Sequence, residues 1–241
     1  EAERAIFDHA PKVFAEFSRL TGAQGPYGLG IWLSAEATLD LFSSESKSVM
    51  RDRLARAGLY PLTLNGFPFG PFHATRVKEK VYQPDWAGPD RWAHTCFLAM
   101  ILGFHLLPPG GHGTISTLPV TFKPWADEAG CYLERTDDVI RFFEERLLPR
   151  GGVAMQLEQG SPARPEEVLR RHVGVCLDTV HTGVMGEDPK EAVAKLAAAG
   201  IRLAKVQLGA ALRVQVGPDG PPPELRAFQD EVYLHQTVVA T

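Results

Sequence analysis

Short apolar runs alternate with longer amphipathic stretches along most of this chain, and this alternation restricts its possible folds most strongly. The runs are rich in Val, Ile and Leu, as are strands buried on both faces of a parallel sheet. The stretches repeat apolar residues at three- and four-residue steps, as does a helix that packs on such a sheet. The pattern therefore predicts strand–helix–strand units. We expect strands at residues 27–33, 59–65, 113–119, 173–178, 201–208 and 232–235, and helices at about 5–20, 34–58, 89–109, 136–147, 166–171 and 189–199.

The fold that best accommodates these units is a (β/α) barrel. None of the strands is followed by the Gly-x-Gly-x-x-Gly fingerprint of a dinucleotide-binding sheet. A length of 241 residues suits a single α/β barrel domain, here residues 1–241. Reactive groups of such a barrel lie at the carboxyl ends of its strands, so we seek functional residues there.

Composition and charge narrow the class of partner. A hydrophobic content of 44% supports a globular core, and a net charge of −4 without clusters of Lys and Arg argues against nucleic-acid binding. The three cysteines lack Cys-x-x-Cys spacing, which favours a reducing, cytoplasmic setting. No apolar stretch is long enough to insert into a membrane, and the first residues do not resemble a signal peptide. The expected partner is a small molecule.

The strand over residues 173–178 ends in the most informative pair of side chains. Asp178 closes the strand, and His181 follows three residues later, where the chain turns. A carboxylate and an imidazole that converge above a strand end are suitable ligands for a divalent metal ion. The alternative is that Asp178 caps the next helix and His181 forms a local hydrogen bond.

The strand over residues 201–208 carries two further polar side chains. Lys205 and Gln207 lie on the same face of this strand, because side chains alternate between the two faces. Lys205 can hold a substrate oxygen or act as a base, and the alternative is that it pairs with a carboxylate inside the barrel.

The segment after Asn65 is too long and too aromatic for a simple connection. It contains His73, Arg76 and Lys78, which can recognise hydroxyl, carboxylate or phosphate groups of a ligand. Together with Asn65 at the strand end, these are the candidate substrate-binding residues. For Arg76 and Lys78 the alternative is an ordinary solvated loop.

Three stretches of the chain, residues 64–79, 174–181 and 205–208, resemble the EboE metabolite traffic family. That family is part of the larger class of xylose isomerase-like proteins, which includes sugar phosphate isomerases and epimerases. The resemblance implies a (β/α)8 TIM barrel with a divalent-metal site.

The same resemblance assigns candidate metal ligands. Asp178 and His181 match the pair that follows the sixth strand in this class, and Gln207 matches the ligand after the seventh. Glu128 matches the second of two glutamates that the family has at its fifth strand, whereas the first has no counterpart here. A closed barrel needs eight strands, so we expect stretches of the barrel to be missing near residues 125–128 and at both ends. An intact mass of 26.4 kDa for the natural protein would contradict this expectation.

The resemblance predicts metal-dependent isomerisation or epimerisation of a sugar, a sugar phosphate or a related polyhydroxy carbonyl metabolite. Mn²⁺ or Mg²⁺ is the expected ion, with Zn²⁺ as the alternative. Lys205 or Glu128 would transfer the proton. One alternative function is a barrel, alone or as a homo-oligomer, that binds a metabolite and passes it to partners of a traffic pathway without turnover. Another is an endonuclease of the same barrel class, which would need more His and Asp ligands and a basic groove.

Overall fold

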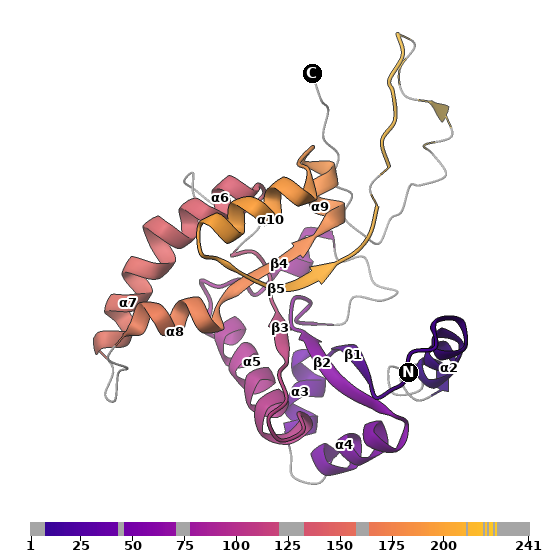
Figure 1. The fold of residues 1–241 in the computed structure, drawn as a ribbon. Helices are drawn as coiled ribbons and strands as arrows, with labels where there is room; N and C mark the ends of the chain where they lie inside the picture. The colour runs from indigo at the N-terminus through magenta and orange to yellow at the C-terminus, as the bar shows by residue number, and fades with distance from the viewer. Residues whose placement is uncertain are drawn as a thin grey trace. The chain divides into compact units, whose positions relative to one another are not determined.

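The computed structural model describes residues 8–42, 46–70, 78–120, 133–157 and 164–210, with short pieces at 212–218, 220, 222–223 and 225. The chain divides into two compact units (Figure 1). We call residues 1–75 and 80–118 the N-terminal unit, and residues 76–79 and 119–241 the C-terminal unit. Each unit has a parallel sheet and a hydrophobic core of its own.

The N-terminal unit contains a parallel sheet of three strands in the order β1-β2-β3. The strands are β1 (Tyr27–Trp32), β2 (Leu59–Asn65) and β3 (Thr114–Ser116). The helices are α2 (Ala10–Thr21), α3 (Ala35–Phe42), α4 (Ser46–Arg56) and α5 (Pro89–Met100). A short 3₁₀ helix, η2 (Lys78–Tyr82), precedes α5, and a π-helix, η3 (Ile101–Leu106), follows it.

The core of the N-terminal unit forms where the apolar residues of β1 and β2 meet those of α4, α5 and η3. Its buried members are Ile31, Leu54, Leu59, Leu64, Leu98 and Leu102. Ile31, Leu59 and Leu64 belong to the apolar runs that predicted β1 and β2. For the helix expected at 89–109, the sequence pattern favours an apolar stripe that includes Trp92 and Phe104. That prediction of the buried face is wrong, because these two side chains are 63% and 80% exposed while Leu98 and Leu102 are buried.

The C-terminal unit contains a parallel sheet of two strands, β4 (Gly174–Asp178) and β5 (Arg202–Gln207). Its helices are α6 (Thr136–Phe142), the π-helix η5 (Phe143–Leu147), α7 (Leu148–Leu157), α8 (Pro165–His172), α9 (Thr179–Val184) and α10 (Pro189–Ala198). One face of the sheet packs against α10 and the helix from α6 to η5 (Figure 1). Buried Phe143, Leu196 and Ile201 form this core, and Val175 and Leu203 pack on it from the strands.

Five of the six expected strands are present, and the sixth, residues 232–235, lies outside the described residues. Parallel pairing with intervening helices confirms the predicted strand–helix–strand units. The expected helix over 34–58 is described as two helices, α3 and α4, on either side of residues 43–45. In the described part of the chain the strands form separate sheets of three and two strands, so a closed eight-stranded TIM barrel in a single domain stays a prediction.

Candidate functional site

The pairing register of β4 and β5 brings the predicted polar side chains together. The strands pair Val175 with Leu203, but the next pair is Cys176 with Lys205, so Ala204 is an extra residue in β5. This β-bulge shifts the pairing register by one residue; without it, Val206 would lie opposite Asp178. As a result Asp178 lies directly opposite Gln207 at the carboxyl ends of the strands.

The carboxylate of Asp178 is the centre of this cluster. Its Oδ1 accepts a hydrogen bond from the backbone N–H of Val180 at 2.9 Å and caps α9, which confirms the capping role considered from the sequence. Its Oδ2 accepts a hydrogen bond from Nε2 of Gln207 at 3.0 Å and lies 4.0 Å from Nε2 of His181. The side chain of Asp178 is 22% exposed and that of His181 is 64% exposed. One oxygen of the Asp178 carboxylate therefore caps α9, and the other lies near the side chains of Gln207 and His181.

Cys176 and Lys205 form the layer beneath this cluster on the same face of the sheet. Burial raises the pKa of the Cys176 thiol, Lys205 acts in the opposite direction, and Asp178 raises the pKa further. The thiol is therefore neutral at pH 7 and unsuited to act as a nucleophile. Lys205 is half-buried, directly beneath the carboxylate and amide that we consider as ligands.

The remaining predicted site residues belong elsewhere in the chain. The side-chain oxygen of Asn65 accepts hydrogen bonds from the N–H of Phe67 at 3.1 Å and the hydroxyl of Ser116 at 3.2 Å. Asn65 thus shapes the turn after β2 and joins it to β3. Residues 73, 76 and 128 lie outside the described residues, so the roles predicted for His73, Arg76 and Glu128 stay predictions. Lys78 begins η2, and its side chain also lies outside the description.

A buried arginine in the N-terminal unit was not singled out by the sequence. Arg91, in the first turn of α5, is 0% exposed. Its Nε donates to the carbonyl of Pro84 at 2.8 Å, and its Nη1 donates to the carbonyls of Gly66 at 2.5 Å and Phe67 at 3.0 Å. Burial lowers the pKa of Arg91 to about 10, with Asp85 acting in the opposite direction, so the guanidinium stays charged at neutral pH. Arg91 anchors the loop that follows β2.

His94 lies one turn further along α5 and is also buried. Its Nε2 is 3.2 Å from the hydroxyl of Thr38, and its ring packs edge-on against Phe69. Burial lowers the pKa of His94, the charge of Arg91 lowers it further, and the carbonyl of Leu33 acts in the opposite direction. Among the described residues, Nδ1 of His94 and Nη2 of Arg91 are buried without a hydrogen-bond partner of normal geometry. Arg91 and His94 thus contact the described residues Gly66, Phe67 and Phe69, which follow β2.

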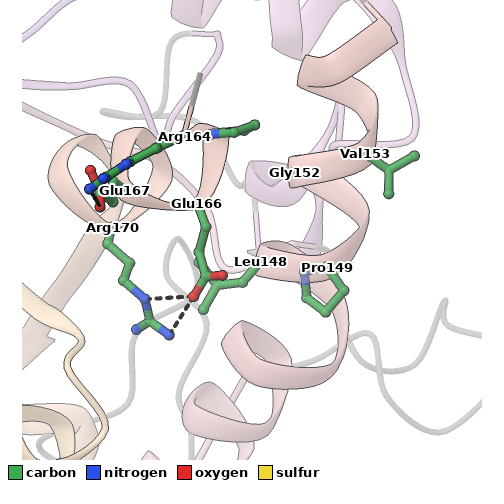
Figure 2. A pocket seen from close by; sticks show the side chains of 9 residues that line it. Leu148, Pro149, Gly152, Val153, Arg164, Glu166, Glu167 and Arg170 are labelled. Carbon is green, nitrogen blue, oxygen red and sulfur yellow. Dashed lines mark hydrogen bonds and ion pairs between the residues drawn. The ribbon is translucent and has the colours of Figure 1, made fainter. Parts of the chain in front are cut away.

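A hollow in the C-terminal unit between α7 and α8 offers a second group of charged side chains (Figure 2). Glu166 pairs with Arg170 at 3.0 Å within α8, and Glu167 pairs at 2.7 Å with Arg164, the N-cap residue of α8. All four side chains are at least 36% exposed. Each carboxylate of the hollow is therefore paired with an exposed arginine, as in an ordinary surface ion pair. We assign no functional residue to this hollow.

The cluster at the strand ends has the donor atoms of a divalent-cation site. Asp178 offers Oδ2, His181 offers an exposed imidazole, and Gln207 would offer Oε1 after its amide turns over. Carboxylate and amide oxygens with one imidazole suit Mn²⁺ or Mg²⁺, and also Zn²⁺. No group of three or more His, Cys, Asp or Glu side chains that could hold a metal ion occurs among the described residues. The set of three therefore depends on the amide of Gln207.

Comparison with known proteins adds no relative to this description. Within the described residues, no helix has both the length and the apolar character needed to cross a membrane. No protein-family model, no curated protein and no solved structure matches this chain.

Proposed function

We propose that this chain belongs to a metal-dependent isomerase or epimerase-like protein that acts on a sugar, a sugar phosphate or a related polyhydroxy carbonyl metabolite. The observation that carries this proposal is the single carboxylate oxygen of Asp178 that faces both Gln207 and His181. These side chains lie at the carboxyl ends of adjacent parallel strands, where α/β enzymes hold their reactive groups. The (β/α)8 TIM barrel and the kinship with the xylose isomerase-like class are part of the same proposal.

The proposed ligands are Asp178, His181 and Gln207. When bound, a divalent ion would supply Lewis acidity that polarises a carbonyl and its neighbouring hydroxyl. Asp178 is held in place by its second oxygen, which caps α9, so its orientation does not depend on the ion. His181 and Gln207 are both exposed, so solvent and a dissolved ion can reach their side chains.

Lys205 is the proposed proton-transfer residue or substrate-oxygen donor. Lys205 lies two residues before Gln207 in β5, and its strand partner is Cys176. Its side chain is therefore on the same face of the sheet as those of Asp178 and Gln207. An ammonium group in this position can hydrogen-bond to a substrate hydroxyl, or accept a proton after deprotonation. Glu128 would be the second acid–base candidate, on the family resemblance.

The test is turnover by chelator-treated protein supplied with Mn²⁺, Mg²⁺ or Zn²⁺. A panel of aldoses, ketoses and their phosphates is followed by proton NMR in D₂O. We expect conversion with one of these ions, and a loss of about 10²- to 10⁴-fold in Lys205→Met with metal affinity unchanged. The exposed Lys190→Met in α10 is the matched control and should retain full activity. Conversion that needs no metal ion would contradict the proposal.

A second candidate function is binding and transfer of the same metabolites without turnover. The 64% exposure of His181 favours it, because an open site does not exclude water from a reacting substrate. The same experiment decides between the two. Saturation-transfer signals from a bound sugar, without conversion under any metal condition, would support transfer.

A further inference from the structure

The segments that follow β4 and β5 are joined by a pair of hydrogen bonds through one hydroxyl group. Thr179 Oγ1 donates to the carbonyl of Gly209 at 2.7 Å and accepts from the N–H of Gly209 at 2.9 Å. Thr179 directly follows Asp178, and Gly209 comes two residues after Gln207. A single side chain therefore holds both backbone groups of a residue on the neighbouring segment.

The close approach of these segments requires glycine at position 209. A Cβ atom placed on Gly209 would lie 2.5 Å from Cγ2 of Val180, well inside the contact distance of two carbon atoms. Val180 also donates the hydrogen bond that orients Asp178. We call the contact of Thr179 and Val180 with Gly209 the junction. The hydrogen bonds of Thr179 hold the two segments together at this junction, and the lack of a side chain at Gly209 lets them approach closely.

This junction controls the distance between the two oxygen-donating ligands of the proposed site. Gln207 is the last residue of β5 and its side chain is exposed, so packing does not fix its position. The hydrogen bonds to Gly209 restrain the backbone just after Gln207, while Thr179 continues directly from Asp178. Restraint on both segments keeps the amide of Gln207 within reach of Oδ2 of Asp178.

We propose that Thr179 is a positioning residue for the cation site, because its hydroxyl holds Gln207 beside Asp178 through Gly209. This inference rests on the proposed function, since it concerns the same cation. Removal of a group that orients a metal ligand without touching the ion commonly weakens metal affinity by about 10- to 100-fold. A threonine hydroxyl that fixes two ligand-bearing segments belongs to that class of group.

The test is Mn²⁺ binding, measured from the electron paramagnetic resonance signal of free Mn²⁺ in titrations of the chelator-treated full chain. Thr179→Val removes the hydroxyl at constant shape and should weaken binding about tenfold. Thr179→Ser retains the hydroxyl and should bind within about twofold of the wild type. Thr182→Val is the matched control, because the Thr182 hydroxyl bonds to carbonyls of residues 178 and 179 and does not reach β5. It should also bind within about twofold of the wild type.

Gly209→Ala separates positioning from a loss of folding. It leaves the hydroxyl of Thr179 intact but forces the segments apart, so it should weaken Mn²⁺ binding as Thr179→Val does, with an unchanged circular dichroism spectrum. Wild-type affinity in both Thr179→Val and Gly209→Ala would overturn this inference, while loss of binding in Asp178→Asn would still support the proposed function. Equal weakening in Thr179→Ser and Thr179→Val would also overturn it. Absence of binding by the wild type would overturn both proposals.

Discussion

Replacement of Arg91 by lysine tests the interior of the N-terminal unit without changing its charge. Arg91 donates from two separate positions, Nε to Pro84 and Nη1 to Gly66 and Phe67. A lysine ammonium placed where Nη1 lies can serve the carbonyls of Gly66 and Phe67, but a methylene group replaces Nε. The carbonyl of Pro84 therefore loses its charged donor.

The expected cost follows from this count of hydrogen bonds. One lost hydrogen bond to a charged group lowers the free energy of unfolding by about 1.5–3 kcal/mol. Within the described part of the chain, the buried Nη2 of Arg91 has no hydrogen-bond partner. The third ammonium hydrogen of a lysine would have none there either, so these two penalties approximately cancel. Arg91→Lys should thus destabilise the unit by about 2 kcal/mol, which lowers the melting temperature of a small domain by roughly 8–16 °C.

Urea unfolding followed by tryptophan fluorescence measures this effect. Trp32 is a suitable reporter because its Nε1 donates to the carbonyl of Pro68 in the loop that Arg91 anchors. Arg51→Lys, in which a half-exposed arginine of α4 is changed, is the matched control and should alter stability by less than about 0.5 kcal/mol. An Arg91→Lys protein as stable as this control would refute the reasoning, since the forked geometry of the guanidinium would then contribute nothing.

Two further predictions concern a buried histidine and a helix cap. The lowered pKa of His94 means that the folded state binds fewer protons than the unfolded state below about pH 6.5, so the free energy of unfolding should fall as the pH drops from 6.5. Urea titrations at pH 7.5, 6.5 and 5.5 should show this slope in the wild type and a smaller slope in His94→Gln, and identical slopes would contradict it. Glu187 accepts hydrogen bonds from the N–H of Thr136, at 3.1 and 3.2 Å, and from its hydroxyl at 3.2 Å, so Glu187→Ala should cost about 1 kcal/mol by thermal unfolding. Glu187→Gln, which keeps an acceptor oxygen, should cost less than half of that, and an equal loss in the two variants would argue against the cap.

The pattern of apolar and polar residues along the sequence was sufficient to predict the five described strands. It also predicted that Asp178, His181 and Gln207 lie together at the carboxyl ends of strands. Apolar runs located β4 and β5, and parallel strands place their carboxyl ends together, so polar residues at those ends meet. The bulge at Ala204 could not be predicted, because alanine has no backbone preference that indicates an extra residue. It nevertheless decides which side chain of β5 lies opposite Asp178.

Contacts between residues distant in the sequence account for the features that the pattern did not predict. Arg91 follows the start of a helix, where an arginine is usually solvated, but carbonyls of residues 66 and 67 make its burial possible. A threonine at the start of a predicted helix, such as Thr136, indicates an N-cap residue. The N-cap residue is Arg135, and the carboxylate that binds the N–H and hydroxyl of Thr136 belongs to Glu187, 51 residues away. Neither partnership has a signal within one segment of the sequence.

The most direct test of the account is Mn²⁺ binding by the wild type and by Asp178→Asn. Asparagine retains the oxygen that caps α9, so the variant should fold while it loses the negative charge and the carboxylate oxygen that faces His181 and Gln207. Glu167→Gln, which changes an exposed carboxylate of α8, is the control. The account predicts near-stoichiometric Mn²⁺ binding by the wild type and by Glu167→Gln, and a loss of more than about tenfold in affinity in Asp178→Asn. Equal affinity in all three proteins, or no binding by the wild type, would contradict it.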